Sequence, residues 1–289
     1  MKVQRSFNQE SANGYGTLYL VATPIGNLED MTYRAVRTLQ EANWIAAEDT
    51  RQTRKLLTHF AIQGRLVTYH EHNVRTSGPE LVAKMKLGES VALVSDAGLP
   101  AISDPGEDLV RLAIEEGIAV VPIPGANAAL SALIISGLPT DRFRFIGFLP
   151  RDKKRMRLSL GQLEEAEDTL IVYESPHRIS ATLGIMLEVL GDRRIALVRE
   201  LTKKFEEVAR GQLSEALLLL EQHPPKGEYC IIIEGRSGIE DDGGAWWKQL
   251  SIAEHVDYYE NKQFPRKEAM KKAAVDRGVP KRDIYNQLL

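Results

Sequence analysis

Ser95-Asp-Ala-Gly-Leu-Pro-Ala-Ile-Ser-Asp-Pro-Gly106 is the stretch of sequence on which the fold prediction depends most. It places two Asp, two Gly and two Pro residues between the apolar run 91–95, which predicts a buried strand, and a helical pattern. These residues constrain the backbone of the segment, because Pro fixes φ and Gly adopts backbone angles closed to other residues. Solvated loops are seldom so constrained. Since α/β proteins bind ligands beyond the carboxyl ends of their strands, the segment predicts an α/β fold with a ligand site here.

The rest of the first half alternates short apolar runs with amphipathic segments. This rhythm indicates an α/β sheet of largely parallel strands. The expected strands are 17–22, 44–47, 66–69, 91–95 and 118–122. We expect this N-terminal α/β domain to span 17–138 and to end at the hinge Gly137-Leu-Pro-Thr140, where Gly and Pro interrupt a helical pattern.

A second α/β domain is expected over 139–236. Its predicted strands are 143–148, 169–173, 195–199, 206–211 and 228–234, with helices near 155–166, 175–190 and 213–222. The strand at 206–211 directly follows another strand, which indicates a mixed sheet. After a Gly-rich linker, three helical patterns predict a small basic helical module over 245–289, in which the turn Gly278-Val-Pro280 resembles that of a helix-turn-helix.

Three helix starts carry local signals. Asp30 is expected to cap a helix that runs to Gln40, and Ser77 with Glu80 three residues later has the spacing of a capping box. Ser175-Pro176 predicts a third start, because Ser is a favoured cap and the missing N–H of Pro costs nothing in the first turn.

Composition sets further limits. The 289 residues suggest two domains with a small appendage, and 43% hydrophobic with 27% charged residues is ordinary globular usage. A net charge of -3 means that any RNA binding must depend on local positive charge. Cys230 lies in an apolar run, which favours a buried thiol over a nucleophile, and the six histidines show no metal-ligand spacing. We expect residues 1–16 to be a mobile leader, no membrane span, no metal and a cytoplasmic location.

Three further strand ends carry unusual residues. Thr23–Leu28 alone predicts a ligand loop no better than an ordinary turn. Ala47-Glu-Asp-Thr-Arg51 has two interpretations, a functional site at Glu48, Asp49 and Arg51 or a structural ion pair. Pro122-Ile-Pro-Gly-Ala-Asn-Ala128 opens a helix of small residues, whose N-terminus favours an anionic group such as a carboxylate.

With Tyr173-Glu-Ser-Pro-His-Arg178 and Arg199-Glu-Leu-Thr-Lys203, these are six ordered motifs. Together they closely resemble the tetrapyrrole methylase-like, or class III, methyltransferases, from about Leu18 to the C-terminus. Within that family the sequence is most similar to the bacterial small-subunit (16S) ribosomal RNA 2′-O-methyltransferase branch. The resemblance implies methylation of a decoding-region cytidine on its ribose 2′-hydroxyl.

The resemblance also implies a cleft between the two α/β domains that holds S-adenosyl-L-methionine without a glycine fingerprint. The implied cofactor neighbours are Pro24, Ser95, Asp96, Ala97, Ile102, Asn127, Ala128, Tyr173, Glu174 and Glu200. Asp96 can accept hydrogen bonds from a ribose or an amino group, and small Ala97 and Ala128 leave room for adenine.

The expected chemistry is a single displacement onto a 2′-hydroxyl, in which positioning of the reactants supplies much of the rate. A base within hydrogen-bond reach would assist, and Glu48, Asp49 and Glu174 are the candidates, with no choice among them from sequence. Lys203 is the candidate to stabilise a developing alkoxide, and Arg51 to bind an RNA phosphate with its bidentate guanidinium. Catalysis by His177 is the less favoured interpretation of a histidine at a helix start.

Two basic segments are candidates for RNA contact. Arg151, Lys153, Lys154 and Arg155 open the second domain, although a charge run is usually a solvated loop. In the C-terminal module the candidates are Lys267, Lys271, Lys272, Lys281 and Arg282. Alternatively, these residues serve solubility, or the module dimerises through Trp246, Trp247 and Tyr258. The expected partners are small-subunit ribosomal RNA, within an assembled 30S particle, and a second copy of the chain in a homodimer.

Two other functions remain open. A tetrapyrrole (porphyrinogen or precorrin) C-methyltransferase shares the fold but is disfavoured by the basic module and the Glu-Asp-Thr-Arg loop. A non-catalytic ribosome-assembly binding module would use the same cleft without chemistry.

Overall fold

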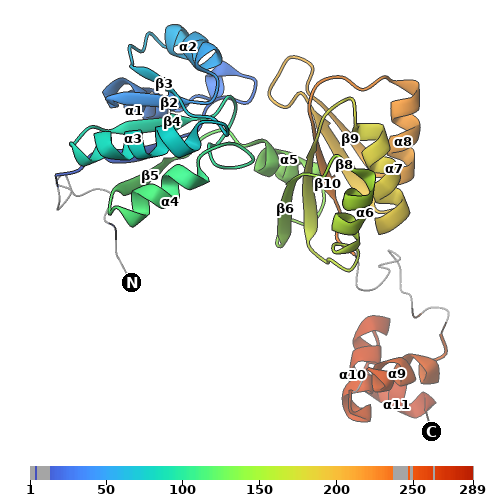
Figure 1. Cartoon of the computed structure of the whole chain (residues 1–289). Coiled ribbons are helices and arrows are strands. Elements are labelled where there is room, and N and C mark those ends of the chain that lie inside the picture. Colours follow the sequence, from blue (N-terminus) through green and yellow to red (C-terminus); the bar gives the residue numbers. More distant parts are fainter. Residues whose placement is uncertain (1–3, 5–13, 237–246, 248–249, 263, 289) are drawn as a thin grey trace. The chain divides into compact units, whose positions relative to one another are not determined.

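The computed structural model describes residue 4 and residues 14–236, 247, 250–262 and 264–288, so most of the predicted leader 1–16 lies outside the described residues. The chain divides into two compact units, residues 1–235 and 236–289. The first unit contains two five-stranded sheets, and the second is helical (Figure 1). Across the described ranges, no helix is both long enough and apolar enough to cross a membrane.

The first sheet has the strand order β3-β2-β4-β1-β5, and its pairings are all parallel, as predicted. The strands are β1 (Thr17–Val21), β2 (Trp44–Ala47), β3 (Leu66–Thr68), β4 (Val91–Val94) and β5 (Ala119–Ile123). Each agrees with its predicted range to within one residue at either end. The agreement follows from chemistry, because strands buried on both faces are short apolar runs bounded by polar or turn residues.

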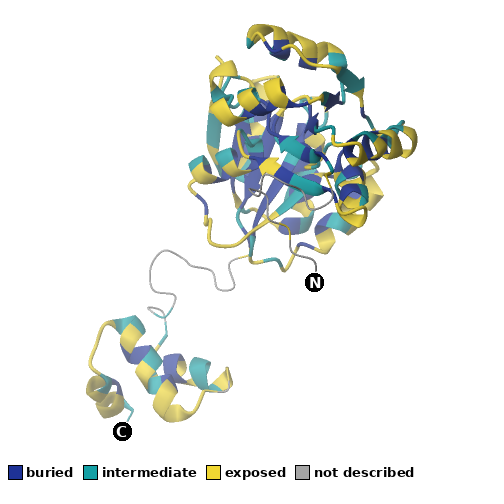
Figure 2. Ribbon diagram, turned by 90° about the vertical axis from the view of Figure 1, so that its left-hand side faces the viewer, coloured by how far each residue is buried: buried dark blue, intermediate teal, exposed yellow. Residues whose placement is uncertain are grey.

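Helices cover both faces of this sheet. They are α1 (Tyr33–Glu41), α2 (Thr50–His59), α3 (Val74–Lys86) and α4 (Glu107–Glu115). Leu39 of α1 and Leu57 of α2 pack in one cluster on one face, whereas Leu81 of α3 and Leu109 of α4 pack in another cluster on the other face. Successive strand residues alternate between the two clusters, so the strands are buried from both sides and appear dark blue in Figure 2.

The two central strands β1 and β4 are neighbours whose connections leave in opposite directions. The chain leaves β1 through α1 on one face and leaves β4 through α4 on the other. A crevice at such a switch point is where open α/β sheets bind ligands. The loops after β1 and β4 meet there, since the Thr23 N–H donates to the Gly98 carbonyl at 2.9 Å and the Gly98 N–H donates back at 3.0 Å.

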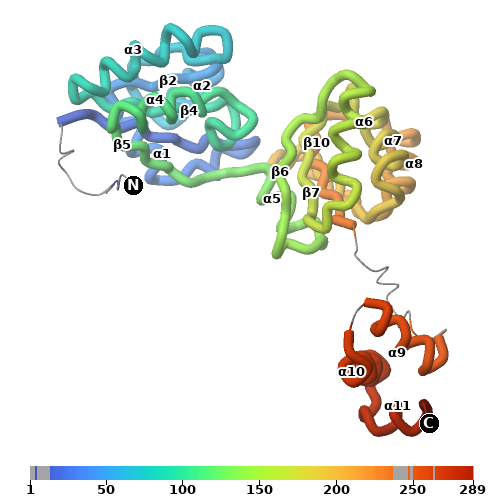
Figure 3. The backbone as a smooth tube through the Cα atoms, turned by 60° about the horizontal axis from the view of Figure 1, so that its bottom comes forward, coloured from blue at the N-terminus to red at the C-terminus, as the bar shows by residue number. Residues whose placement is uncertain are grey.

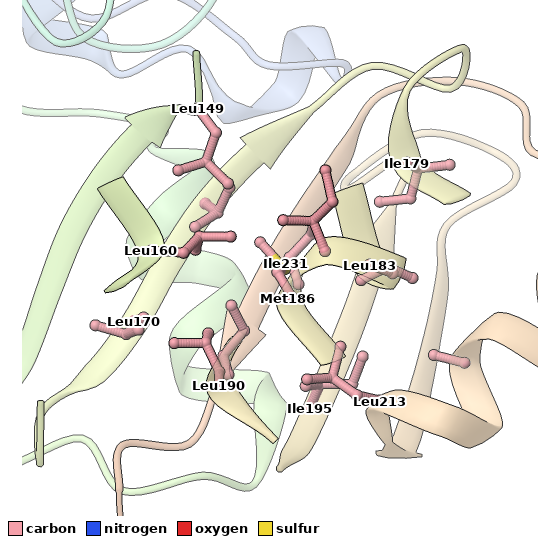
Figure 4. Close-up of a cluster of buried hydrophobic side chains, with 14 of the residues drawn as sticks. Leu149, Leu160, Leu170, Ile179, Leu183, Met186, Leu190, Ile195, Leu213 and Ile231 are labelled. Carbon is pink, nitrogen blue, oxygen red and sulfur yellow. The ribbon is translucent and has the colours of Figure 1, made fainter. Parts of the chain in front are cut away.

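The second sheet has the order β6-β7-β10-β8-β9 and is mixed, as predicted, because β6 and β7 are parallel and the other pairs antiparallel. Its strands are β6 (Phe143–Phe148), β7 (Thr169–Glu174), β8 (Arg194–Arg199), β9 (Glu207–Gln212) and β10 (Tyr229–Ile233). One face carries α6 (Lys153–Gly161), α7 (Ile179–Leu190) and α8 (Leu213–Gln222). Figure 4 shows this core, in which leucines of the helices meet Leu170, Ile195 and Ile231 of the strands.

The opposite face of the second sheet is covered by α5 (Ala128–Ser136), which precedes β6 in the chain (Figure 3). Leu133 of α5 packs with Ile171, Val198 and Ile232 of the strands. The predicted first domain, 17–138, therefore includes a helix that packs on the second sheet. The predicted hinge at 137–140 follows that helix, where Gly137 ends it in a left-handed conformation.

The three predicted helix starts are wrong in position. Asp30 ends a short 3₁₀ helix, and α1 begins after Thr32, whose hydroxyl accepts from the Ala35 N–H. Ser77 and Glu80 lie inside α3, which already begins at Val74. Ser175-Pro176 begins a turn, and α7 begins at Ile179. A side chain two residues further on caps α1, whereas the cap residues of α3 and α7, Asn73 and Arg178, make no side-chain cap bond.

The C-terminal unit contains α9 (Ile252–Asn261), α10 (Arg266–Arg277) and α11 (Lys281–Gln287) around Val256, Ala269, Ala273 and Ile284. As predicted, Gly278 turns the chain between α10 and α11, with a φ of 62° and a hydrogen bond from the Val279 N–H to the Ala274 carbonyl.

A buried polar network locks α9 onto α10 in this unit. His255 Nδ1 accepts from Arg277 Nε at 3.0 Å, and its Nε2 lies 3.0 Å from the Asp276 carboxylate. The Arg277 guanidinium also binds the carbonyl oxygens of Trp247, Leu250 and Ser251. Burial lowers the pKa of His255 and so disfavours its protonation in this network. Arg277 is thus a structural residue of the basic module.

Candidate functional site

A cavity of about 300 Å³ lies where loops after strands of both sheets come together, within the range of small-molecule sites. The first sheet contributes Ile25 and residues of the loop 96–104. The second sheet contributes the last residues of β6 and β7, residues at the end of β8 and just after it, and the start of β10. Eight of the ten predicted cofactor neighbours line it, namely Asp96, Ala97, Ile102, Asn127, Ala128, Tyr173, Glu174 and Glu200.

The other two predicted neighbours, Pro24 and Ser95, are not among the lining residues. Ser95 is buried, and its hydroxyl lies 3.3 Å from the carbonyl oxygens of Ala97 and Gly98. The Thr23 hydroxyl donates to the Ser95 carbonyl at 3.1 Å. These contacts hold the loops in shape, and Ile25 lines the cavity in place of its neighbour Pro24.

The loop 95–106 has a strained backbone. Ala101 has a φ of 67° and Ser103 a φ of 60°, both in the left-handed region that residues with a side chain rarely adopt. Such strain concentrates at ligand sites, where the surrounding structure holds it in place. The loop that decided the fold prediction is therefore one of two strained segments at the cavity, the other being the segment of Glu200 and Thr202.

The carboxylates of Asp104, Asp96 and Glu48 lie close enough together at this loop to affect one another's charge. Asp104 lines the cavity, and burial, together with the charges of Glu48 and Asp96, raises its pKa to about 6. Burial and the Asp96 charge also raise the pKa of Glu48, which lies outside the cavity lining. Asp96 accepts a hydrogen bond from the Asp49 N–H at 3.2 Å, which ties this loop to the start of α2.

Glu174, a predicted base, lines the cavity but has its carboxylate occupied. The side chain is 1% exposed. One oxygen accepts from the Ser175 N–H at 2.8 Å, and the other accepts from the Thr182 hydroxyl at 2.7 Å and lies 3.2 Å from the Arg178 guanidinium. A carboxylate bound by this many donors is fixed in position, so its geometry is that of a structural anchor.

Lys203 and Glu200, also predicted, form a pair at the cavity wall. The Lys203 ammonium lies 3.0 Å from the Glu200 carboxylate, and Glu200 has a φ of 52°. The loop after β1 packs closely on this segment, because a side chain at Gly26 would meet the Leu201 carbonyl at 3.1 Å. Glycine at position 26 therefore lets the two loops touch.

Asp49 and Arg51 form an ion pair outside the cavity lining. Their charged groups approach to 2.8 Å, and the Asp49 carboxylate also accepts from the Arg51 N–H at the start of α2. These hydrogen bonds lower the pKa of Asp49 to about 2. The ion pair of the structural interpretation is thus formed by Asp49 and Arg51, whereas Glu48 takes no part in it, and a functional role for the three residues stays a prediction.

The basic residues predicted to bind RNA differ in how exposed they are and in whether they contact other side chains. Arg151, Lys153, Lys154 and Arg155 are exposed around the start of α6, and no ion pair is found for them among the described residues. In the C-terminal unit Lys267, Lys271 and Arg282 are exposed, whereas Lys281 is half-buried and the Lys272 ammonium lies 4.6 Å from the centre of the Phe264 ring.

Several lining residues were not among the predicted site residues, and Asp104 and Phe148 are the two that matter most for the chemistry. Asp104 lies inside the motif 95–106. The sequence feature that could have identified it is a charged residue followed by Pro105 and Gly106. Phe148 lines the cavity although it is 58% exposed. The sequence feature that could have identified Phe148 is Gly147, since an isolated glycine in a strand pattern suggests a bulge. Within the described ranges, no group of three or more His, Cys, Asp or Glu residues is placed to hold a metal ion.

Comparison with known proteins places this cavity in a family. The profile of the tetrapyrrole (corrin/porphyrin) methylases matches residues 17–217, a range that includes the first sheet, all strands of the second sheet except β10, and most of the cavity residues. The chain belongs to the tetrapyrrole methylase family. The methyltransferase CobJ has the same fold, with a TM-score of 0.58 at 17% identity over 76% of this chain and 95% of that chain.

Within the tetrapyrrole methylases, the chain belongs to the group named ribosomal RNA small subunit methyltransferase I. The protein of that name from Halalkalibacterium halodurans is 57% identical over 286 residues, which cover 99% of this chain and 98% of the relative. The one from Bacillus subtilis is 51% identical over 287 residues, with the same coverage. The similarity includes the C-terminal unit, which lies beyond the part matched by the family profile.

Proposed function

We propose that the chain is an S-adenosylmethionine-dependent methyltransferase that methylates the ribose 2′-hydroxyl of a cytidine in the decoding region of small-subunit ribosomal RNA. The observation that carries this proposal is the 57% identity, over nearly the full length, to a ribosomal RNA small subunit methyltransferase I. The assembled particle as substrate, the homodimer and the cytoplasmic location stay predictions from the sequence.

The cavity residues fit S-adenosylmethionine. Ala97, Gly98 and Ala128 are small and keep the space open for a flat base. Asp96, Asp104 and Glu200 suit a ligand that carries sulfonium and ammonium charges. Asn127 caps α5 through a 2.8 Å bond from the Leu130 N–H, and the other N–H groups of this first turn can receive the ligand's carboxylate.

Asp104 is the side chain best placed to take a proton. When bound, S-adenosylmethionine supplies an electrophilic methyl group, and the attacking 2′-hydroxyl must lose its proton. Asp104 faces the cavity, and its raised pKa brings it closer to that of a useful base at neutral pH. Glu174 is held by its hydrogen bonds and Asp49 by Arg51, which leaves them less suited to this role.

The exposed basic groups fit the RNA. Basic side chains begin three residues after the cavity residue Phe148 in the chain, at Arg151, Lys153, Lys154 and Arg155, so they can contact phosphates beside the reacting ribose. Lys267, Lys271 and Arg282 give the C-terminal unit a positive surface that can bind the RNA backbone.

The proposal predicts transfer of a labelled methyl group from S-adenosylmethionine to small-subunit particles taken from cells that lack this modification. Particles that already carry the modification are the control and should accept almost no label. A chain that methylates a porphyrinogen and leaves both kinds of particle unlabelled would contradict the proposal. Calorimetric binding of the cofactor without turnover on any RNA would instead indicate a non-catalytic binding module.

A further inference from the structure

Phe148 owes its position to a bulge in the edge strand β6. The pairing of β6 with β7 shifts between Phe145 and Gly147, and Gly147 adopts a φ of 70°. In a regular strand, residues 145 and 147 would share a face. The bulge instead places Phe145 and Phe148 on the same side, where both rings contact Tyr173, at 5.1 and 5.6 Å between centroids. Bulges that re-aim a side chain are common beside active sites.

Most of the Phe148 ring is exposed to solvent. Phe148 is 58% exposed although it lines the cavity, and its contact with Tyr173 is T-shaped. An edge-to-face contact occupies at most one face of the ring. An exposed phenyl face at the rim of the cavity is costly in water and suits a flat apolar partner.

Positive charge follows this ring closely in the chain. Arg151, Lys153 and Lys154 follow within six residues and are exposed. The intervening backbone is anchored, because the Arg178 guanidinium donates to the carbonyl oxygens of Leu149 and Pro150 at 3.0 and 3.2 Å. Arg178 is itself held by the buried Glu174 carboxylate. The ring and the charges are therefore presented together on a fixed support.

We propose that Phe148 stacks on a nucleobase of the RNA strand whose ribose enters the cavity, while the basic segment 151–155 contacts the neighbouring phosphates. The inference rests on the proposed function and adds a residue that recognises the substrate. Single-stranded RNA is bound by this combination of an aromatic ring for the base and positive groups for the backbone. A ring in this place holds the reacting nucleotide without reading its sequence.

The test uses the full chain with three substitutions at one position. Phe148→Ala and Phe148→Leu remove the ring, whereas Phe148→Trp keeps an aromatic face. We measure kcat and KM with small-subunit particles that lack the modification, and the Kd of S-adenosylmethionine by calorimetry. Phe143→Ala is the matched control, because Phe143 is a 45% exposed ring on the same strand that does not line the cavity.

We expect Phe148→Ala and Phe148→Leu to lower kcat/KM for the particles by about 5- to 150-fold, the span of base–aromatic stacking, mainly through KM. Phe148→Trp should stay within about 3-fold of the wild type, by the same stacking principle. The cofactor Kd should not change in any variant, and Phe143→Ala should match the wild type.

Three results would overturn the proposal. Weaker cofactor binding in Phe148→Ala would make the ring a wall of the cofactor site. A Leu variant as active as the wild type would show that apolar bulk suffices without stacking, and an unchanged Ala variant would remove the residue from substrate binding. Each of these leaves the proposed function standing, whereas wild-type protein that methylates no RNA overturns both.

Discussion

Replacement of Asp104 by Asn is expected to lower the rate of methyl transfer by about 10²- to 10⁴-fold, the usual contribution of a general base. The amide keeps the size of the side chain but cannot take the proton of the 2′-hydroxyl. The rate is measured in single turnovers with saturating cofactor and unmodified small-subunit particles. Asp108→Asn is the matched control, because Asp108 is an exposed residue of α4 that pairs with Arg111 at 2.6 Å outside the cavity.

The pH dependence gives this first prediction a second readout. Because the pKa of Asp104 is raised to about 6, the carboxylate is protonated below that pH and cannot act as a base. The wild-type rate should therefore fall as the pH is lowered through about 6, and the residual rate of Asp104→Asn should lack this step. A variant with nearly wild-type rate, or an unchanged pH profile, would exclude Asp104 as the base.

The stability of Asp104→Asn should rise, in the opposite direction to its activity. A carboxyl group whose pKa is raised by folding binds its proton more tightly in the folded state, so its ionisation disfavours folding as the pH rises through the folded pKa. At pH 7 the uncharged amide that replaces the carboxylate avoids this cost. We therefore expect Asp104→Asn to raise the free energy of unfolding at pH 7 while it lowers activity, which separates a catalytic loss from misfolding.

Replacement of Glu174 by Ala is expected to lower the free energy of unfolding by about 3–5 kcal/mol, the cost of removing one partner of a buried ion pair. The substitution leaves the Arg178 guanidinium without its carboxylate and the Thr182 hydroxyl without its acceptor. Urea denaturation at pH 7 measures the change. In Glu188→Ala, which removes an exposed carboxylate paired with Arg157, we expect little change.

Glu174→Gln sharpens this second prediction. The amide retains an oxygen for one donor but loses the charge that faces Arg178, so its stability should lie between that of the wild type and that of the Ala variant. Full stability of Glu174→Ala combined with loss of methyl transfer would contradict the structural role. It would restore Glu174 as a candidate base.

Much of the fold follows from local sequence. The strands of the first sheet are short apolar runs, and their ends are marked by Gly, Pro and charged residues, so they were predicted to within one residue. The packing of α5 was not predictable in the same way. Its residues are apolar on all sides, so the sequence does not say which sheet the helix covers. Only tertiary contacts with Ile171 and Val198 assign it to the second sheet.

The site was predicted as segments more accurately than as side-chain roles. The motif 95–106 marked the cavity loop because constrained residues are visible in a sequence. Hydrogen-bond partners are not visible, and they are what ties the Glu174 carboxylate to Thr182 and pairs Asp49 with Arg51. Phe148 was missed because residue alternation places it on the wrong face until the bulge at Gly147 is known.

The central claim is that this chain transfers a methyl group to one ribose of small-subunit ribosomal RNA. Mapping of 2′-O-methylation along that RNA, in cells with and without the gene, tests it most directly. We predict that one cytidine in the decoding region loses its ribose methyl group in the deletion strain and regains it when the wild-type chain, but not Asp104→Asn, is supplied. An identical methylation map in both strains would contradict the account.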